Sequence, residues 1–232
     1  MMPLLHIRPN PHQSNRKVIK MNIALIGASG YVGSALLQEA LSRGHRVTAL
    51  VSNSSRLAAQ PGLEVVATDV VDGVALATQL QGRDALISAF SGHAQQDVFG
   101  YYVKGIRAII AAAKQAGVPR LLVVGGAGSL EVAPGVQLVD TPVFPAQWKA
   151  TAEGAREALN ILRDERDLDW TMLSPAAHLE PGRRTGQFRL GTDQLLVDAA
   201  GESRISLEDY AVAMIDELET PSHARRRFAV AY

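Results

Sequence analysis

The chain has 232 residues, of which 47% are hydrophobic, and its 23 basic and 23 acidic residues give a formal net charge of zero. This length suits one α/β domain with a sizeable core, and the neutral balance gives no reason to expect nucleic acid or an anionic membrane as a partner. The lack of cysteine excludes disulfides, a thiolate nucleophile and cysteine-ligated metals. It fits a cytoplasmic protein, and the chain has no apolar run of the roughly 18 to 20 residues that span a bilayer.

Residues 1–20 differ from the rest of the chain. They contain Pro3, Pro9 and Pro11 among scattered polar residues, and their apolar run is too short for a signal peptide. We therefore expect a disordered or loosely packed extension, which is either a functional arm or an artefact of cloning or of the assigned start. The folded domain is expected to span residues 21–232.

The first element is expected at residues 23–26, a short apolar strand that ends at Gly27. Gly30 and Gly33 follow at three-residue spacing, and apolar residues then recur at helical spacing over residues 32–40. This order binds dinucleotides, because glycines let the backbone approach a pyrophosphate and the N–H groups of a helix start attract its charge. Taken alone, the glycines would also permit a tight turn without a ligand. The expected cofactor contacts in this turn are Gly27, Ser29, Gly30, Tyr31 and Val32.

Strand-like and helix-like segments alternate after this turn. Further strands are expected at residues 46–51, 63–68, 84–88, 121–124, 169–173 and 228–231. Further helices are expected at residues 74–80, 97–116, 145–166 and 207–219, with residues 174–206 irregular and residues 225–227 in a solvated turn. The alternation predicts an α/β fold: a Rossmann-like doubly wound parallel sheet with helices on both faces, in a single domain with a small C-terminal substrate-side region.

The residues past the glycine turn bear on which nucleotide binds. No Asp or Glu occurs between Glu39 and Glu64, where an NAD-specific site places a carboxylate on the ribose. Ser52 and Arg56 follow the second strand instead, and a hydroxyl and a guanidinium can both bind a 2′-phosphate. NADP(H) is therefore the preferred cofactor, and NAD(H) is the alternative if these residues form only a polar turn.

Ligands of such sheets lie beyond the carboxyl ends of the strands. Asp69 and Val70, after the third strand, are expected beside adenine, with Asp69 accepting a hydrogen bond from its exocyclic amine. Ala89 and Phe90, after the fourth strand, would border the cofactor ribose. The nicotinamide side of the pocket is expected to be lined by Gly126 and Pro175.

The acid catalyst of many short-chain dehydrogenases is missing. That catalyst is a Tyr with a Lys four positions later, and none of the five tyrosines has a Lys at this spacing. Trp148 and Lys149 stand where the pair is expected, at the start of the helix over residues 145–166. The indole has no acidic proton, and Lys149 is either a catalytic cation or a surface lysine. Ser129 follows a glycine-rich turn and is either a catalytic hydroxyl or a local backbone cap.

His178 follows the sixth strand and would line the substrate pocket with Trp148, or it would be an ordinary hydrogen-bonded loop histidine. The six histidines show no ligand spacing, so no metal is expected. The expected partner is a small-molecule acceptor. The long helices over residues 97–116 and 145–166 could also pair two subunits as a homo-oligomer.

Several segments carry a likeness to a known family: VGGAGSLEVAPG (124–135), DLDWT (167–171), LSPAA (173–177), EPG (180–182), RTG (184–186), DQLLVD (193–198) and RIS (204–206). With these segments, residues 21–232 resemble the atypical short-chain dehydrogenase/reductase group of NAD(P)H-binding proteins, and most closely the candidate NADH-flavin reductases. Members of that group usually carry Tyr where Trp148 stands, Arg where Ser52 stands and an aromatic residue where His178 stands. These departures put tyrosine-dependent proton transfer in doubt and weaken the preference for NADP.

The resemblance implies hydride transfer from NAD(P)H to a flavin, a quinone or a similar conjugated acceptor. This chemistry fits the missing tyrosine, because reduced flavin nitrogens take protons from water and the protein then supplies proximity and orientation. The alternative is a non-catalytic NADP(H)-binding redox sensor that acts through a partner protein. A sugar or steroid epimerase is disfavoured, because such enzymes normally need the Tyr–Lys pair.

Overall fold

The computed structural model describes residues 20–93 and 95–232, so the expected N-terminal extension lies outside the described residues except for Lys20. The strands expected from the sequence are β1 (Asn22–Ile26), β2 (Arg46–Val51), β3 (Leu63–Ala67), β4 (Ala85–Ser88), β5 (Arg120–Val124), β8 (Asp169–Ser174) and β12 (Arg226–Ala231). The helices are α1 (Tyr31–Ser42), α2 (Gly73–Leu80), α3 (Val98–Ala116), α4 (Ala146–Asp164) and α5 (Leu207–Glu219). The expected order of strands and helices is confirmed, with small differences at the ends.

Five short strands were not expected. They are β6 (Glu131–Ala133), β7 (Val136–Gln137), β9 (His178–Glu180), β10 (Arg189–Gly191) and β11 (Arg204–Ser206). Strand β9 pairs in parallel with β11, and β6 pairs antiparallel with β7. The expectation that residues 174–206 are irregular was therefore wrong where β9, β10 and β11 form. Three single-turn 3-10 helices complete the elements: η1 (Ser54–Arg56), η2 (Ala127–Ser129) and η3 (Leu138–Asp140).

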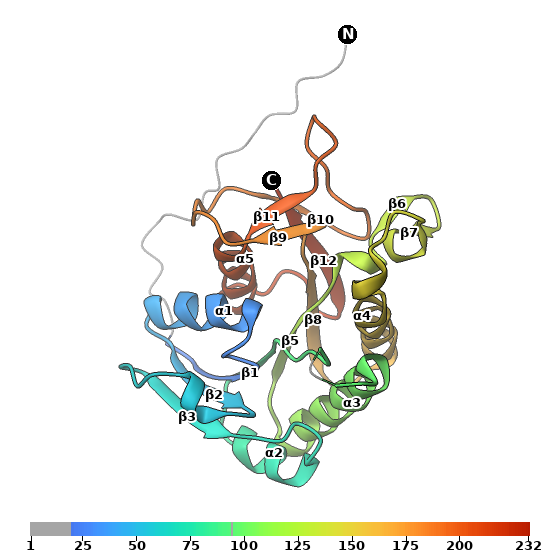
Figure 1. The fold of residues 1–232 in the computed structure, drawn as a ribbon. Helices are drawn as coiled ribbons and strands as arrows, with labels where there is room; N and C mark the ends of the chain where they lie inside the picture. The colour runs from blue at the N-terminus through green and yellow to red at the C-terminus, as the bar shows by residue number, and fades with distance from the viewer. Residues whose placement is uncertain (1–19, 94) are drawn as a thin grey trace.

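The large sheet has eight strands in the order β10-β12-β8-β5-β4-β1-β2-β3 (Figure 1). Strand β10 is antiparallel to β12, and every other pair of neighbours is parallel. Strand β1 lies between β2 and β4, so the chain order reverses at the β1–β4 junction. This is the topological switch point of a doubly wound sheet, and it confirms the predicted Rossmann-like fold.

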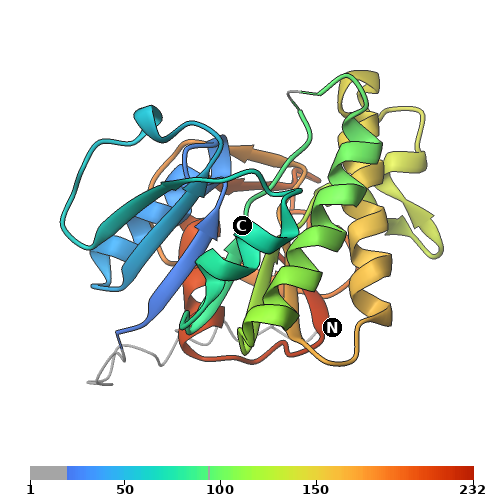
Figure 2. The ribbon, with the colours of Figure 1, turned by 90° about the horizontal axis from the view of Figure 1, so that it is seen from below.

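The sheet is covered on both faces, as its continuous apolar strands require. Helices α1 and α5 pack together on one face, and α2, α3 and α4 lie side by side on the other (Figure 2). Alternate residues of β1 enter opposite cores: Ile23 and Leu25 face the α1–α5 side, whereas Ala24 and Ile26 face the α2–α3–α4 side. Because both faces are buried, the strands show no polar alternation.

Arg227 lies inside the protein, which corrects the expectation of a solvated turn at residues 225–227. It is the second residue of β12, and only 3% of its side chain is exposed. Its Nη1 donates to the backbone O and to Oγ of Ser129, at 3.0 and 2.9 Å, and its Nε donates to Oδ1 of Asp193 at 2.9 Å. The strand begins at Arg226, and its alternation turns the next side chain inward, where an oxygen-rich site receives the guanidinium.

A buried carboxylate on α1 ties the helix to a loop and, through an arginine, to α5. Glu39 accepts hydrogen bonds from Arg43 at 2.7 Å and from Arg184 at 2.7 and 2.8 Å. Arg43 also binds Asp216 and Glu219 of α5. Burial would raise the pKa of Glu39, but the hydrogen bonds from Arg184 and Arg43 outweigh it and hold the pKa below the ordinary value of 4.5.

Glu39→Gln is expected to lower the free energy of unfolding at pH 7 by about 2 kcal/mol, because hydrogen bonds to a charged group are lost. The folded-state pKa lies below the unfolded one, so the wild type has this stability at neutral pH and loses it as the pH falls through the folded value. The variant should therefore lose stability less steeply between about pH 5 and pH 3. Urea unfolding across this range, with exposed Glu202→Gln as the control, measures the difference. Equal slopes for Glu39→Gln and wild type would contradict the assignment.

Candidate functional site

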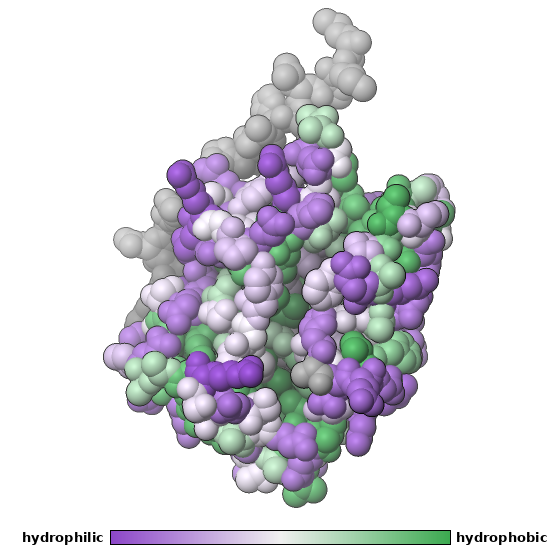
Figure 3. Space-filling model, in the orientation of Figure 1, coloured by the Kyte–Doolittle hydropathy of each residue, from purple (hydrophilic) through white to green (hydrophobic). Residues whose placement is uncertain are grey.

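The residues expected to contact a cofactor stand in a row along one edge of the sheet. Pro175, Gly126, Ala89, Gly27, Ser52 and Asp69 follow β8, β5, β4, β1, β2 and β3 in the order of the strands in the sheet. This edge faces the viewer in Figure 1. In the space-filling view of the same face, a hollow with hydrophobic residues at its floor runs down the middle (Figure 3). A ligand at the switch point would lie against this edge.

The three glycines after β1 have different roles. Gly27 has a φ of 77°, and a Cβ there would lie 2.6 Å from the backbone O of Ala89, at the end of β4. A Cβ at Gly33 would lie 2.0 Å from the backbone O of Gly27, so Gly33 lets α1 pack onto the turn. Around Gly30, apart from its two chain neighbours, the only atom of the described residues within 4 Å of an added Cβ is the same oxygen, at 3.2 Å. The space beyond Gly30 is therefore open to a ligand.

The start of α1 is suited to an anion. Gly30 is its N-cap, no side chain caps it, and its first turn carries no acidic residue in this described part of the chain. Asp72, Asp97 and Ser206 cap the starts of α2, α3 and α5 with side-chain oxygens, whereas α4 begins after Pro145 without a side-chain cap, as α1 does after Gly30. An uncapped helix start leaves backbone N–H groups for a ligand, and the helix dipole favours negative charge there. The open glycine and the uncapped helix together fit a diphosphate.

The residues after β2 and β3 form ordered polar turns. Ser52 and Arg56 are exposed, and Arg56 lies in η1. Asn53 holds the turn with its Oδ1, which accepts from the backbone N of Ser55 at 3.0 Å. Asp69 is exposed and accepts from the backbone N of Val71 at 3.1 Å, so one of its oxygens serves the turn. The expected contacts of these residues with a 2′-phosphate and with adenine stay predictions.

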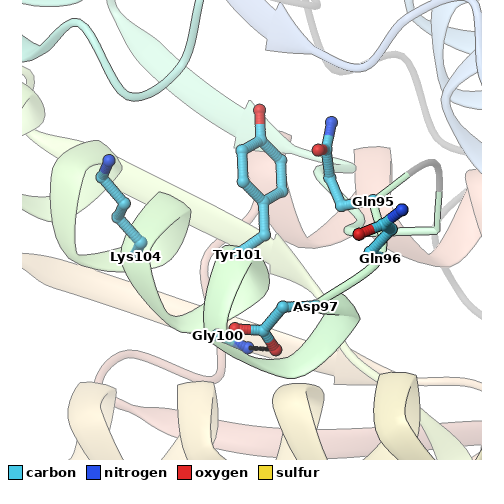
Figure 4. A pocket seen from close by; sticks show the side chains of 6 residues that line it. All are labelled: Gln95, Gln96, Asp97, Gly100, Tyr101 and Lys104. Carbon is cyan, nitrogen blue, oxygen red and sulfur yellow. Dashed lines mark hydrogen bonds between the residues drawn. The ribbon is translucent and has the colours of Figure 1, made fainter.

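The loop after β4 leads to a pocket at the start of α3. The ring of Phe90 lies 5.4 Å from that of Tyr101 and 5.9 Å from that of Tyr102, between centroids, so its side chain packs on α3. Beside Tyr101 lies an open pocket of about 460 Å³ (Figure 4). Asp97 at its rim accepts from the backbone N of Gly100 at 2.8 Å and caps the helix. The pocket is lined by Gln95, Gln96, Asp97, Gly100, Tyr101 and Lys104, none of which was expected in the site.

On the side of the site where the substrate is expected, the structure contains a contact that the sequence did not predict. Trp148 is 53% exposed near the start of α4, and its ring meets that of His93 at 87° with 5.7 Å between centroids. The Nδ1 of His93 lies 3.1 Å from Oγ1 of Thr151. Lys149, next to Trp148, is exposed. The place of His93 in the loop after β4, at the ligand-binding edge, was the signal that could have singled it out.

Pro175 and His178 both follow β8, but they differ in environment. Pro175 is buried directly after the strand, whereas His178 is exposed on β9. The next residue, Leu179, accepts a hydrogen bond from Tyr31 Oη at 3.1 Å, which places β9 beside the start of α1. The expected roles of Pro175 against the nicotinamide and of His178 in the pocket stay predictions.

Ser129 is buried, and its hydroxyl has a long-range partner. Its Oγ accepts from Nη1 of Arg227, which lies 98 residues further along the chain. This bond joins η2 to β12. It differs from both roles expected for Ser129, which were a catalytic hydroxyl and a local backbone cap. A further bond from this hydroxyl to a substrate stays a prediction.

The described residues offer neither a cluster of metal ligands nor a helix that could cross a membrane. Within residues 20–93 and 95–232, no three or more His, Asp or Glu side chains are grouped so that they could hold a metal ion. None of the helices in the described part of the chain has both the length and the apolar character that crossing a membrane would take.

Known proteins are similar to this chain in sequence and fold. Residues 27–221 match a family described as NAD(P)H-binding. The uncharacterised protein YwnB of Bacillus subtilis is 43% identical over 213 residues, which cover 90% of this chain and 98% of YwnB. The structure of a candidate epimerase from Bacteroides thetaiotaomicron is 45% identical, with a TM-score of 0.86, and covers 92% of this chain and 98% of its own. That of a candidate NADH-flavin reductase from Streptococcus pneumoniae is 34% identical, with a TM-score of 0.80, and covers 91% and 99%. The chain therefore belongs to the NAD(P)H-binding family.

Proposed function

We propose that the protein is an NAD(P)H-dependent reductase that transfers hydride directly to a flavin, a quinone or a similar conjugated acceptor. The observation that carries this proposal is the open, uncapped start of α1 at the switch point of the sheet. A coenzyme diphosphate would bind there, at the carboxyl ends of the strands. The acceptor is expected at the same edge of the sheet. The candidate NADH-flavin reductase from Streptococcus pneumoniae supports the choice of acceptor class.

The residues of the chain would act by binding and orientation. The N–H groups at the start of α1 hold the diphosphate, Ser52 and Arg56 face the 2′-phosphate, and Gly126 and Pro175 border the nicotinamide. When bound, the reduced nicotinamide supplies a hydride. Holding two reactants in the right geometry is worth about 7 kcal/mol or more of the barrier, so the reaction does not require a tyrosine acid.

The residue at position 148 argues against chemistry that needs a phenol. Trp148 stands where the Tyr of a Tyr–Lys pair is expected, and no tyrosine of the chain has a Lys four positions later. An epimerase of this fold normally uses that pair, so the description of the Bacteroides relative as a candidate epimerase stays with that protein. A reductase of conjugated rings is compatible with an indole at this position.

Turnover with several acceptors tests the proposal. Oxidation of NADPH and NADH is measured as the loss of reduced-nicotinamide absorbance. The acceptors are FMN, FAD and menadione, and one reaction contains no acceptor. We expect oxidation that depends on at least one acceptor. Tight NADPH binding without turnover on any of them would contradict the reductase and favour a redox-sensing regulator.

Arg56→Ala is expected to weaken NADPH binding by roughly tenfold or more, because hydrogen bonds from a guanidinium to a phosphate are worth about 1.5–3 kcal/mol. NADH has no 2′-phosphate, so its dissociation constant should change less than about twofold. Arg46→Ala, at the other end of β2, is the matched control and should change neither. Equal weakening of NADPH and NADH by Arg56→Ala would remove the 2′-phosphate role.

A further inference from the structure

The loop between β4 and α3 brings His93 to the start of α4. His93 is exposed, and two neighbours on α4 orient its ring: Thr151 at Nδ1 and Trp148 through its ring. Among the described residues, Nε2 of His93 has no hydrogen-bond partner. The imidazole is therefore fixed at one nitrogen and available at the other.

This face of α4 lies against the turn after β5. A Cβ at Gly126 would lie 3.4 Å from Cβ of Ala155, which is one helical turn beyond Thr151 on the same face. Gly126 and the loop that carries His93 thus follow neighbouring strands, β5 and β4. Because both contact the same helix, we expect the imidazole on the nicotinamide side of the site.

The residue types suit proton transfer. An indole N–H is not an acid at neutral pH, whereas an imidazolium loses a proton near neutrality. In the imidazolium, Nδ1–H donates to Oγ1 of Thr151, and the same bond remains after Nε2 has released its proton. Because a hydroxyl can both accept and donate, Thr151 orients the ring in either protonation state, and Nε2 is the nitrogen left to give up a proton.

We propose that His93 donates a proton to the carbonyl oxygen of a quinone-like acceptor, with Thr151 as its positioning residue, and that this acceptor class rather than a flavin is the substrate. This inference rests on the proposed reductase function. The quinone accepts a hydride, which is one hydrogen with two electrons, from the reduced coenzyme. One of its carbonyl oxygens then becomes an oxyanion. The Nε2–H bond of His93 then breaks, an O–H bond of the hydroquinone forms, and water reprotonates the imidazole. A reduced flavin takes its proton from water and does not need this group.

His93→Gln tests the proposal in the intact enzyme. We expect the turnover number with menadione to fall about 100-fold, because a general acid typically contributes 10²–10⁴. Turnover with FMN and the affinity for NADPH should change less than about threefold. Thr151→Val should lower menadione turnover in the same direction, and added imidazole should restore part of it in His93→Ala. His223→Gln, the same change at the opposite edge of the sheet, should leave menadione turnover, FMN turnover and NADPH affinity unchanged. His223 pairs with buried Glu217, so thermal unfolding first shows that this variant is folded.

A second readout does not depend on activity. Diethyl pyrocarbonate should label His93 in the wild-type protein, and saturating menadione should slow this labelling when the modified peptide is quantified by mass spectrometry. Labelling that menadione leaves unchanged would contradict contact between His93 and the acceptor.

The outcomes separate this inference from the proposed function. If none of the acceptors supports NADPH oxidation by the wild type, the reductase itself is wrong. If it reduces menadione and His93→Gln does so equally well, the reductase stands and the role of His93 is wrong. A wild type that reduces FMN and not menadione would overturn the assignment of a quinone-like substrate.

Discussion

Replacing Gly30 with Asp is expected to abolish coenzyme binding, with an affinity loss of about 1000-fold. Two unit charges 4 Å apart at a protein surface repel by about 4 kcal/mol, which corresponds to roughly three orders of magnitude in the dissociation constant. The carboxylate would project into the space beyond Gly30, where the diphosphate is expected. The fold should survive, because among the described residues beyond its chain neighbours an added Cβ meets only the backbone O of Gly27, at 3.2 Å, and a shift of a few tenths of an ångström relieves that contact.

Two other variants separate charge from size and binding from folding. Gly30→Asn has nearly the same volume without the charge, so it should weaken binding much less than Gly30→Asp. Gly33→Ala should instead destabilise the fold, because its Cβ would lie 2.0 Å from a backbone oxygen. NADPH affinity measured by coenzyme fluorescence, beside a thermal unfolding curve, distinguishes these effects. A Gly30→Asp protein that binds NADPH like the wild type would show that the diphosphate lies elsewhere.

Asp209→Ala is expected to lower the free energy of unfolding by about 4 kcal/mol, among the largest effects of single substitutions. Asp209 is fully buried on α5, and its carboxylate accepts from the backbone N of Thr185 and of Gly186, each at 2.7 Å, and from Tyr232 Oη at 2.8 Å. Removal of the carboxylate breaks these hydrogen bonds to a charged acceptor together, and each such bond is worth about 1.5–3 kcal/mol. Each kcal/mol lowers the midpoint of thermal unfolding by roughly 2–4 °C in a protein of this size, so a fall of about 8–16 °C is expected.

The control for Asp209→Ala replaces an exposed aspartate. Asp164→Ala, at the exposed C-terminal end of α4, should change stability by about 0.5 kcal/mol or less. Asp209 also holds the loop that follows β9, next to the start of α1, so its loss should expose residues 182–186 to limited proteolysis. An unfolding midpoint within about 2 °C of the wild type would contradict this account of the carboxylate.

The large elements could be predicted because their signals are local. Apolar runs such as residues 46–51 are long enough to read as strands buried on both faces, and α3 ends at Gly117, whose φ of 66° is the left-handed cap that a helix end favours. The glycine turn is also local, since the strand, glycines and helix follow one another directly. The switch point then follows from the order of strands and helices.

The short strands could not be predicted, because their pairing depends on distant partners. Strand β9 pairs with β11 at a separation of 26 residues, and β10 pairs antiparallel with β12. Strands β9, β10 and β11 have only three residues each, too few to show a hydrophobic period. The direction in which Arg227 points is likewise set by β12 and by Ser129 and Asp193, and three consecutive arginines alone suggest a solvated turn.

The candidate site divides in the same way. The strand-end residues could be assigned from their place in the chain, because parallel strands bring their carboxyl ends to one edge. The contact of His93 with Trp148 and Thr151 joins segments 55 to 58 residues apart and depends on the course of a loop, so no local pattern announces it. The partner of Ser129 is more distant still.

The central claim is that the turn after β1 holds the diphosphate of a nicotinamide coenzyme. Isothermal titration calorimetry of the unmodified protein with NADPH and with NADH tests it most directly, after circular dichroism has shown that the sample is folded. We expect saturable heat for a single site, with the tighter dissociation constant for NADPH. Folded protein that gives no heat with either coenzyme would contradict the claim.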